Sequence, residues 1–115
     1  METEAKGQVP NERRKHPRHR ITKNINIVSS DGRTIRGITL NIGEGGLAAA
    51  ISFPLVVGDR VTLEPVGGGA VSAVVQRVLG RIYGFQFLNL SSEQVQRIRE
   101  ACKYLPLHTG VAGNL

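Results

Sequence analysis

The sequence has very little cysteine, no tryptophan and no long hydrophobic run. Its only cysteine, Cys102, cannot form a disulfide within the chain or supply a multi-cysteine metal site, which fits a reducing compartment. No apolar run approaches the roughly 20 residues that span a bilayer, and residues 1–10 are polar where a secretory signal would be apolar. We therefore expect a soluble cytoplasmic protein without membrane insertion.

The sequence also lacks a recognisable catalytic or metal-binding constellation. Its three histidines, His16, His19 and His108, lie towards the two ends of the chain, and its carboxylates are scattered singly. His16 and His19 have a spacing that metals use, but two ligands beside several arginines make a poor cation site. Cys102 falls on or near the apolar stripe of a predicted helix without an identifiable base, which favours a buried structural thiol. We expect a protein that is not an enzyme and that holds neither a cofactor nor a metal.

What the sequence does contain is a sizeable apolar fraction and an excess of positive charge. Its 115 residues allow one compact domain, and 40% hydrophobic with 21% charged residues is typical of a folded chain. The formal net charge is +6 and the sequence pI is about 10.3. This balance favours an anionic partner such as a nucleotide, a nucleic acid or an acidic lipid.

The positive charge is concentrated near the N-terminus. The block 11–20 holds five cations, opposed there by a single glutamate: Arg13, Arg14, Lys15, Arg18 and Arg20. Pro17 in the same block disfavours a helix at the preceding residue and interrupts any strand ladder. We expect residues 1–20 to form a flexible N-terminal arm, residues 21–106 the folded domain, and residues 107–115 a disordered tail.

After the arm, apolar and polar residues alternate in short stretches separated by turn residues. The first stretch is centred on Ile25 and Ile27 and ends at a Ser-Asp-Gly sequence that predicts a hairpin turn. In the next stretch, Ile38, Leu40 and Ile42 are expected on one face of a strand because they lie two residues apart. The strands expected after the first cover about residues 33–40, 47–51, 60–64, 70–79 and 81–87.

A helical period replaces the strand pattern after Ser91. Ser91 and Gln94 predict a capping box, Ile98 and Leu105 belong to an apolar stripe, and Pro106 ends the helix after Leu105. Since this is the only helical pattern, the dinucleotide-binding and P-loop folds are poor candidates. The sequence predicts an all-β fold, a six-stranded antiparallel β-barrel with one C-terminal α-helix across an opening.

Two segments carry most of the chemistry. Arg14 and Arg18 could hold one ligand from two directions, because a guanidinium forks two hydrogen bonds to phosphate or guanine and also stacks on a base. The cluster 41–46 combines Asn41 with three glycines, whose positive φ and small size would let a ligand approach main-chain amides. Taken singly, such segments are more often a solvated basic tail and a hairpin turn. Together they suit a guanine nucleotide.

In their order and spacing, these residues resemble the PilZ domain family. Arg14-x-x-x-Arg18 is similar to the arginine pair on the family's N-terminal arm, and Asn41-x-Gly43-x-x-Gly46 is similar to its (Asp or Asn)-x-Ser-x-x-Gly motif at a strand end. A closing strand and a helix follow, so the resemblance covers nearly the whole folded chain. It implies a PilZ-like split barrel that binds the bacterial second messenger cyclic di-GMP.

The resemblance also implies roles for individual residues. Arg14 and Arg18 would hold phosphates and guanines, Asn41 would meet a guanine, and Gly46 would shape the loop. Arg13, directly before the arginine pair, implies an intercalated cyclic di-GMP dimer and therefore two ligand molecules per chain. The complete expected ligand site is Arg13, Arg14, Arg18, Asn41, Gly43, Gly45 and Gly46.

One position departs from the family motif, and two alternative functions stay open. Gly43 replaces the motif serine, so a hydroxyl hydrogen bond is missing and the affinity is expected to fall roughly five- to tenfold. The leading hypothesis is a receptor or adaptor whose arm becomes ordered on binding the nucleotide and which signals to an unidentified downstream protein. The alternatives are a nucleotide-independent protein-interaction module and a small basic barrel that binds RNA or DNA. Few aromatic residues are present to stack on bases, which makes nucleic acid the weaker partner.

Overall fold

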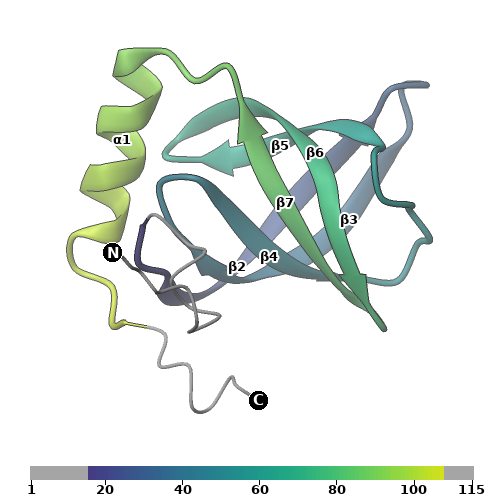
Figure 1. The fold of residues 1–115 in the computed structure, drawn as a ribbon, viewed down its shortest axis with the longest axis horizontal. Helices are drawn as coiled ribbons and strands as arrows, with labels where there is room; N and C mark the ends of the chain where they lie inside the picture. Colours follow the sequence, from purple (N-terminus) through teal and green to yellow (C-terminus); the bar gives the residue numbers. More distant parts are fainter. Residues whose placement is uncertain (1–15, 108–115) are drawn as a thin grey trace, which may run out of the picture.

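The structure is a computed structural model that describes residues 16–107. In this range six antiparallel strands close into a barrel in the order β2-β3-β4-β7-β6-β5, and a helix follows them (Figure 1). The expected all-β barrel with one C-terminal helix is thereby confirmed. The elements are β2 (His19–Ser29), β3 (Thr34–Ile42), β4 (Gly46–Ile51), β5 (Arg60–Val66), β6 (Gly69–Leu79), β7 (Ile82–Leu88) and α1 (Ser92–Cys102).

The strand β2 closes the barrel because it pairs with both β3 and β5. The predicted hairpin turn between β2 and β3 is confirmed: the Gly32 amide donates to the Ser29 carbonyl at 2.9 Å, and Gly32 has a φ of 88°. Only a residue that tolerates positive φ fits there, which is why the turn needs glycine. This tight connection fixes the register in which β2 runs beside β3.

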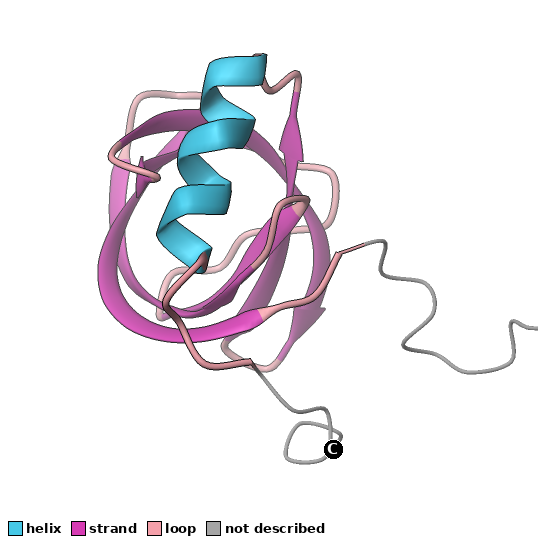
Figure 2. Ribbon diagram, turned by 90° about the vertical axis from the view of Figure 1, so that its left-hand side faces the viewer, coloured by secondary structure: helices cyan, strands magenta, loops and turns pink. Residues whose placement is uncertain are grey.

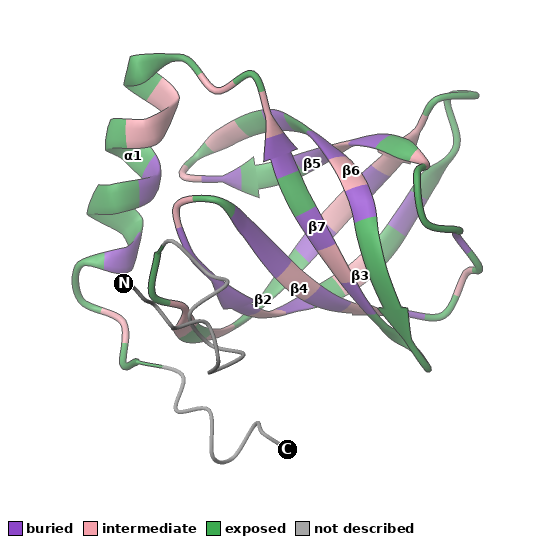
Figure 3. Ribbon diagram, in the orientation of Figure 1, coloured by how far each residue is buried: buried purple, intermediate pink, exposed green. Residues whose placement is uncertain are grey.

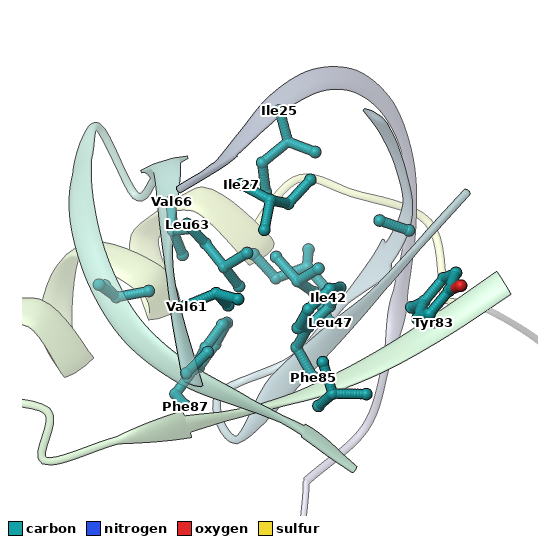
Figure 4. Packing of buried hydrophobic residues seen from close by; sticks show 14 of the residues in the cluster. Ile25, Ile27, Ile42, Leu47, Val61, Leu63, Val66, Tyr83, Phe85 and Phe87 are labelled. Atoms are coloured by element: carbon teal, nitrogen blue, oxygen red, sulfur yellow. The ribbon is translucent and has the colours of Figure 1, made fainter. Parts of the chain in front are cut away.

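The core fills the interior of the barrel with branched and aromatic side chains (Figure 4). Alternate residues along each strand point inward, as a two-residue period requires. The largest side chains that are fully buried come from five strands and the helix: Phe85, Ile27, Leu47, Leu63, Ile98 and Val75. The barrel therefore supplies a rigid platform on which the loops between strands are held.

The prediction that Ile38, Leu40 and Ile42 share one face of β3 is wrong, because Ile38 is exposed and Ile42 is buried. Ile38 is 42% exposed and Leu40 is half-buried, whereas Thr39 between them is buried. A β-bulge between Thr39 and Asn41 then adds one residue to β3 relative to β4, so that Ile42 returns to the interior. A bulge reverses the inward and outward alternation of a strand, and hydrophobic periodicity alone does not reveal it.

The helix α1 lies across one open end of the barrel (Figure 2). Its predicted capping box is present, with the Ser91 hydroxyl accepting from the Gln94 amide at 3.1 Å and the Gln94 side chain accepting from the Ser91 amide at 2.8 Å. The helix ends at Cys102 instead of Leu105, because the last residues tighten into a turn in which the Leu105 amide donates to the Cys102 carbonyl. No helix within residues 16–107 is long and apolar enough to cross a membrane.

Cys102 is buried against the barrel, which confirms the expected structural thiol. Burial raises the pKa of the Cys102 thiol, and the nearby Glu44 carboxylate raises this pKa further. Because the folded state favours the neutral thiol, the free energy of unfolding is expected to be undiminished below the ordinary thiol pKa of about 8.5 and to fall as the pH rises above it. Denaturant unfolding between pH 7 and 10 measures this slope. The slope is expected to flatten in Cys102→Ala, and an equal slope in both proteins contradicts the assignment.

Candidate functional site

The two motifs singled out in the sequence meet where β2 begins and β3 ends. In the antiparallel register, His19 lies opposite Ile42 and Arg20 lies opposite Asn41. Arg18 immediately precedes β2, and its guanidinium NH1 donates a 2.6 Å hydrogen bond to Asn41 Oδ1. Residues that are 23 positions apart in sequence are therefore in direct contact.

Asn41 is almost completely enclosed at this contact. Its exposure is 8%, so the side chain has little access to solvent. Arg18 donates to its side-chain carbonyl oxygen, so this acceptor is already engaged by a guanidinium. A ligand that is to replace this hydrogen bond at Asn41 Oδ1 must therefore displace the Arg18 guanidinium.

The loop after Asn41 is closed by a hydrogen bond of its own and is tied to β7 by another. The Gly43 amide donates to the Gly46 carbonyl at 2.9 Å, which closes the turn between β3 and β4. The Phe87 amide donates to the Gly45 carbonyl at 2.9 Å, which ties the same turn to β7. The loop is thus a preformed part of the barrel rim.

The glycines of this loop are needed for space, and the expectation of positive φ is wrong. None of the loop glycines is among the positive-φ residues of the described chain. A Cβ atom on Gly46 would lie 2.1 Å from the Phe85 carbonyl oxygen, and one on Gly43 would lie 2.6 Å from the Pro17 carbonyl oxygen. Gly45 is different, because a Cβ there would meet nothing closer than 3.8 Å. Close backbone approach by β7 and by the segment before β2 therefore explains two of the three glycines.

A charged group beside the loop was not anticipated from the sequence. Glu44 forms an ion pair with Arg99 of α1, with Arg99 Nε 3.0 Å from a carboxylate oxygen, and it lies 3.7 Å from His16 Nδ1. Glu44 and Arg99 are 55 residues apart in the sequence, so no local sequence pattern predicts this ion pair. Arg99 offsets a negative charge that would otherwise oppose an anionic ligand at this loop.

A hollow of about 340 Å³ lies beside the loop, between the segment before β2 and the end of α1. It is lined by Pro17, His19, Glu44, Arg99, Glu100, Cys102 and Lys103. A larger cavity of about 810 Å³ lies elsewhere, between β2, the β5–β6 turn and α1, and none of the expected site residues lines it. The smaller hollow is therefore the one that adjoins the two motifs.

Some of the residues singled out in the sequence lie outside residues 16–107, and His19 lies inside this range. Arg13, Arg14 and His108 lie outside the described residues. His19 does not belong to an arm: it starts β2, its Nδ1 lies 3.3 Å from the Leu105 carbonyl oxygen, and it pairs with Leu107. Within residues 16–107 no group of three or more potential metal ligands occurs.

The family model and two of the solved structures that match this chain belong to one family. The PilZ domain family model matches residues 12–104. The PilZ domain of CeSA from a cellulose-synthesizing bacterium is 21% identical with a TM-score of 0.63, covering 75% of this chain and 94% of its own. The PilZ domain of YcgR from Escherichia coli, solved with cyclic di-GMP, is 18% identical with a TM-score of 0.67, covering 81% and 91%.

A third solved structure and the curated proteins complete the comparison. The Bacillus subtilis inhibitor of motility, MotI or DgrA, is 19% identical with a TM-score of 0.64; the match covers 79% of this chain and 49% of that protein. No curated protein matches the sequence significantly. At these identities the solved structures establish a shared fold.

Proposed function

Because the chain belongs to the PilZ domain family, we propose that it is a cyclic di-GMP receptor or adaptor that signals to a downstream protein and catalyses no reaction. The observation that carries this proposal is the contact between Arg18 and Asn41, since it brings together the two segments that resemble the family's ligand-binding motifs. The Gly43–Gly46 turn follows Asn41 directly and would form a fixed edge of the proposed ligand site.

The chemistry of this place suits a ligand with phosphates and guanines. A guanidinium can bind a phosphate or the O6 and N7 atoms of guanine through two hydrogen bonds, and an asparagine amide offers both a donor and an acceptor. In the proposed exchange, Arg18 turns from Asn41 to the nucleotide, and the Asn41 amide becomes available to a base. Arg13 and Arg14 would join from the preceding residues.

The proposed ordering of the arm needs a hinge, and we place it at Pro17 and Arg18. His19 and Arg20 are already attached, because the Arg20 amide donates to the Pro106 carbonyl at 2.7 Å and His19 contacts the Leu105 carbonyl. The segment that changes place would therefore end at Arg18. Ligand binding would alter the surface before β2 while the barrel stays unchanged.

Isothermal titration calorimetry with cyclic di-GMP tests the proposal, with GTP as the control ligand. Micromolar or tighter binding by the wild type, lost in Arg14→Ala/Arg18→Ala and absent with GTP, is the expected result. The control Arg33→Ala/Arg60→Ala removes the same charge at exposed positions away from Asn41 and is expected to bind normally. A ratio near two nucleotides per chain is expected if Arg13 supports an intercalated dimer.

Other outcomes point to the alternatives. Binding of RNA or DNA with a steep salt dependence, in place of cyclic di-GMP, indicates the nucleic-acid function. That function has little structural support, because Tyr83, Phe85 and Phe87 are buried and unavailable for stacking. Absence of heat with every nucleotide indicates a nucleotide-independent interaction module.

Restoring the motif serine in Gly43→Ser is expected to tighten cyclic di-GMP binding by about five- to tenfold. The hydroxyl adds a hydrogen bond of about 1 kcal/mol. The new Cβ would also lie 2.6 Å from the Pro17 carbonyl oxygen and 3.0 Å from Arg18 Cδ, so the segment that carries Arg18 must shift away from the loop. Calorimetry on Gly43→Ala separates the two effects, because alanine displaces Pro17 without adding a hydroxyl and is expected to gain less. Weaker binding by the serine variant shows that the Pro17 contact persists in the complex.

A further inference from the structure

Four outward-facing apolar residues lie side by side across four strands. Ile38 on β3 is opposite Ala50 on β4, Ala50 is opposite Ile82 on β7, and Ile82 is opposite Leu79 on β6. Directly opposed residues of antiparallel strands share one face of the sheet. We call Ile38, Ala50, Leu79 and Ile82 the apolar row.

The apolar row is accessible and contiguous. Ile38 is 42% exposed, Ile82 43% and Leu79 71%, and Ala50 between them is half-buried. Single exposed apolar side chains are ordinary, but a contiguous exposed patch is typical of an interaction site. Leu79 and Ile82 of the row flank the β6–β7 turn, and this hairpin projects at the end of the barrel away from α1 (Figures 1 and 3).

The charged residues on the four strands of the apolar row are of one sign. The strands β3, β4, β6 and β7 contain no aspartate or glutamate. Their charged residues and that of the hairpin turn are Arg36, Arg77 and Arg81, all exposed, and none of them forms an ion pair within residues 16–107. By contrast, both arginines of α1 are paired with carboxylates.

We propose that the apolar row and its three arginines dock a protein partner that presents apolar side chains flanked by carboxylates. Apolar contact supplies the core of such an interface, and unpaired arginines at its rim complement acidic groups and select the partner. This inference rests on the proposed function, since it identifies the surface through which the adaptor reaches its downstream protein.

The charges also decide between an acidic partner and a second copy of this chain. In a symmetric dimer the same patch would face itself, so Arg36, Arg77 and Arg81 of one protomer would meet the same arginines of the other. Such like-charge contacts oppose association. An acidic partner meets no such repulsion.

The apolar row is close enough to the proposed nucleotide site for one partner to contact both. Gly46 and Ala50 lie on the same strand, four residues apart, which corresponds to about 13 Å at the rise of a β-strand. A partner seated on the row can therefore also contact the segment before β2 after the nucleotide has rearranged it. The row itself contains none of the expected nucleotide-binding residues, so the two functions are separable by substitution.

A pair of synthetic amphipathic helical peptides tests the docking surface. Both peptides carry leucine along one face, and their other face carries glutamate in the first and lysine in the second. We expect the acidic peptide to shift the amide resonances of residues 38, 50, 79 and 82 and to bind at least tenfold more tightly than the basic peptide. Raising the salt from 50 to 500 mM is expected to weaken this binding, because exposed charges are screened.

Two double variants make the test specific. Leu79→Asp/Ile82→Asp is expected to reduce binding of the acidic peptide at least tenfold while leaving the heat of cyclic di-GMP binding unchanged. The control Tyr104→Asp/Leu107→Asp changes exposed apolar residues beside α1, and it is expected to keep peptide binding. The nucleotide and the peptide are titrated separately. If the wild type does not bind cyclic di-GMP, the receptor proposal is overturned, and the peptide result still decides the docking proposal.

Four results overturn the docking proposal. They are equal binding of the acidic and basic peptides, resonance shifts confined to α1, concentration-dependent self-association that Leu79→Asp/Ile82→Asp abolishes, and binding of the same face to vesicles of anionic phospholipid in place of the acidic peptide.

Discussion

The Arg18→Ala variant is expected to bind cyclic di-GMP about 100-fold more weakly than the wild type. In the proposed complex Arg18 makes two charge-assisted hydrogen bonds, at about 1.5–3 kcal/mol each. To bind the ligand, the wild type must first break the hydrogen bond between Arg18 and Asn41. The variant has no such bond to break, so this cost reduces the difference in affinity between the two proteins. The net loss is about 2.7 kcal/mol, equivalent to 100-fold in the dissociation constant.

Two further variants determine whether charge or geometry carries this effect. Arg18→Lys keeps the charge but loses the planar fork, so we expect its affinity to stay within about tenfold of that of Arg18→Ala. Arg60→Ala removes one exposed positive charge from β5 and is expected to bind as the wild type does. Calorimetry at fixed salt measures all three, because long-range charge effects depend on ionic strength.

Equal affinities of Arg18→Ala and the wild type would contradict the assignment of Arg18 to the ligand. In that case the hydrogen bond to Asn41 has a structural purpose, and the thermal stability of Arg18→Ala is expected to fall instead. A buried polar group that loses its partner costs about 1–3 kcal/mol, which is measurable by thermal unfolding.

The Gly46→Ala variant is expected to lose about 3 kcal/mol of folding free energy. A Cβ at this position would lie 2.1 Å from the Phe85 carbonyl oxygen and 3.3 Å from the Gln86 Cα atom. Both atoms belong to the backbone of β7, which pairs with β4 here and cannot rotate aside as a side chain would. The two strands must separate locally, so overpacking reaches the upper end of its usual cost.

Gly45→Ala is the matched control for this prediction. It adds the same methyl group one residue earlier, where the nearest atom is His16 Cδ2 at 3.8 Å. Thermal unfolding is expected to show a fall in Tm of roughly 15 °C for Gly46→Ala and little change for Gly45→Ala. A small effect in both variants would show that β4 and β7 can move apart at this point without loss of stability.

Local patterns in the sequence predicted most of the secondary structure. The strand over 70–79 and the capping box at Ser91 depend on residues within ten positions of one another, so they can be recognised without a fold. Where the prediction of β3 was wrong, the cause was the bulge near Thr39, which depends on the partner strand β4. The position of His19 was also missed, because its contacts come from Leu105 and Leu107 at the other end of the chain.

The candidate site shows the same division. The types and order of the residues in both motifs could be read from the sequence, and so could the departure at Gly43. Their direct contact could not, since it follows from the pairing of β2 with β3. The reason for Gly43 was equally hidden, because the obstructing atom is a backbone oxygen of Pro17. The roles of Arg13 and Arg14 stay predictions, as these residues lie outside the described range.

The sequence by itself determined the class of fold, the positions of most strands and of the helix, and the family of the protein. Each of these follows from local periodicity, turn and cap chemistry, or motif spacing, which are properties of neighbouring residues. Only the tertiary structure decided that Arg18 donates a hydrogen bond to Asn41, that Glu44 pairs with Arg99, and that the apolar row lies across four strands. Those contacts depend on the closure and register of the barrel, which bring together residues that are distant in sequence.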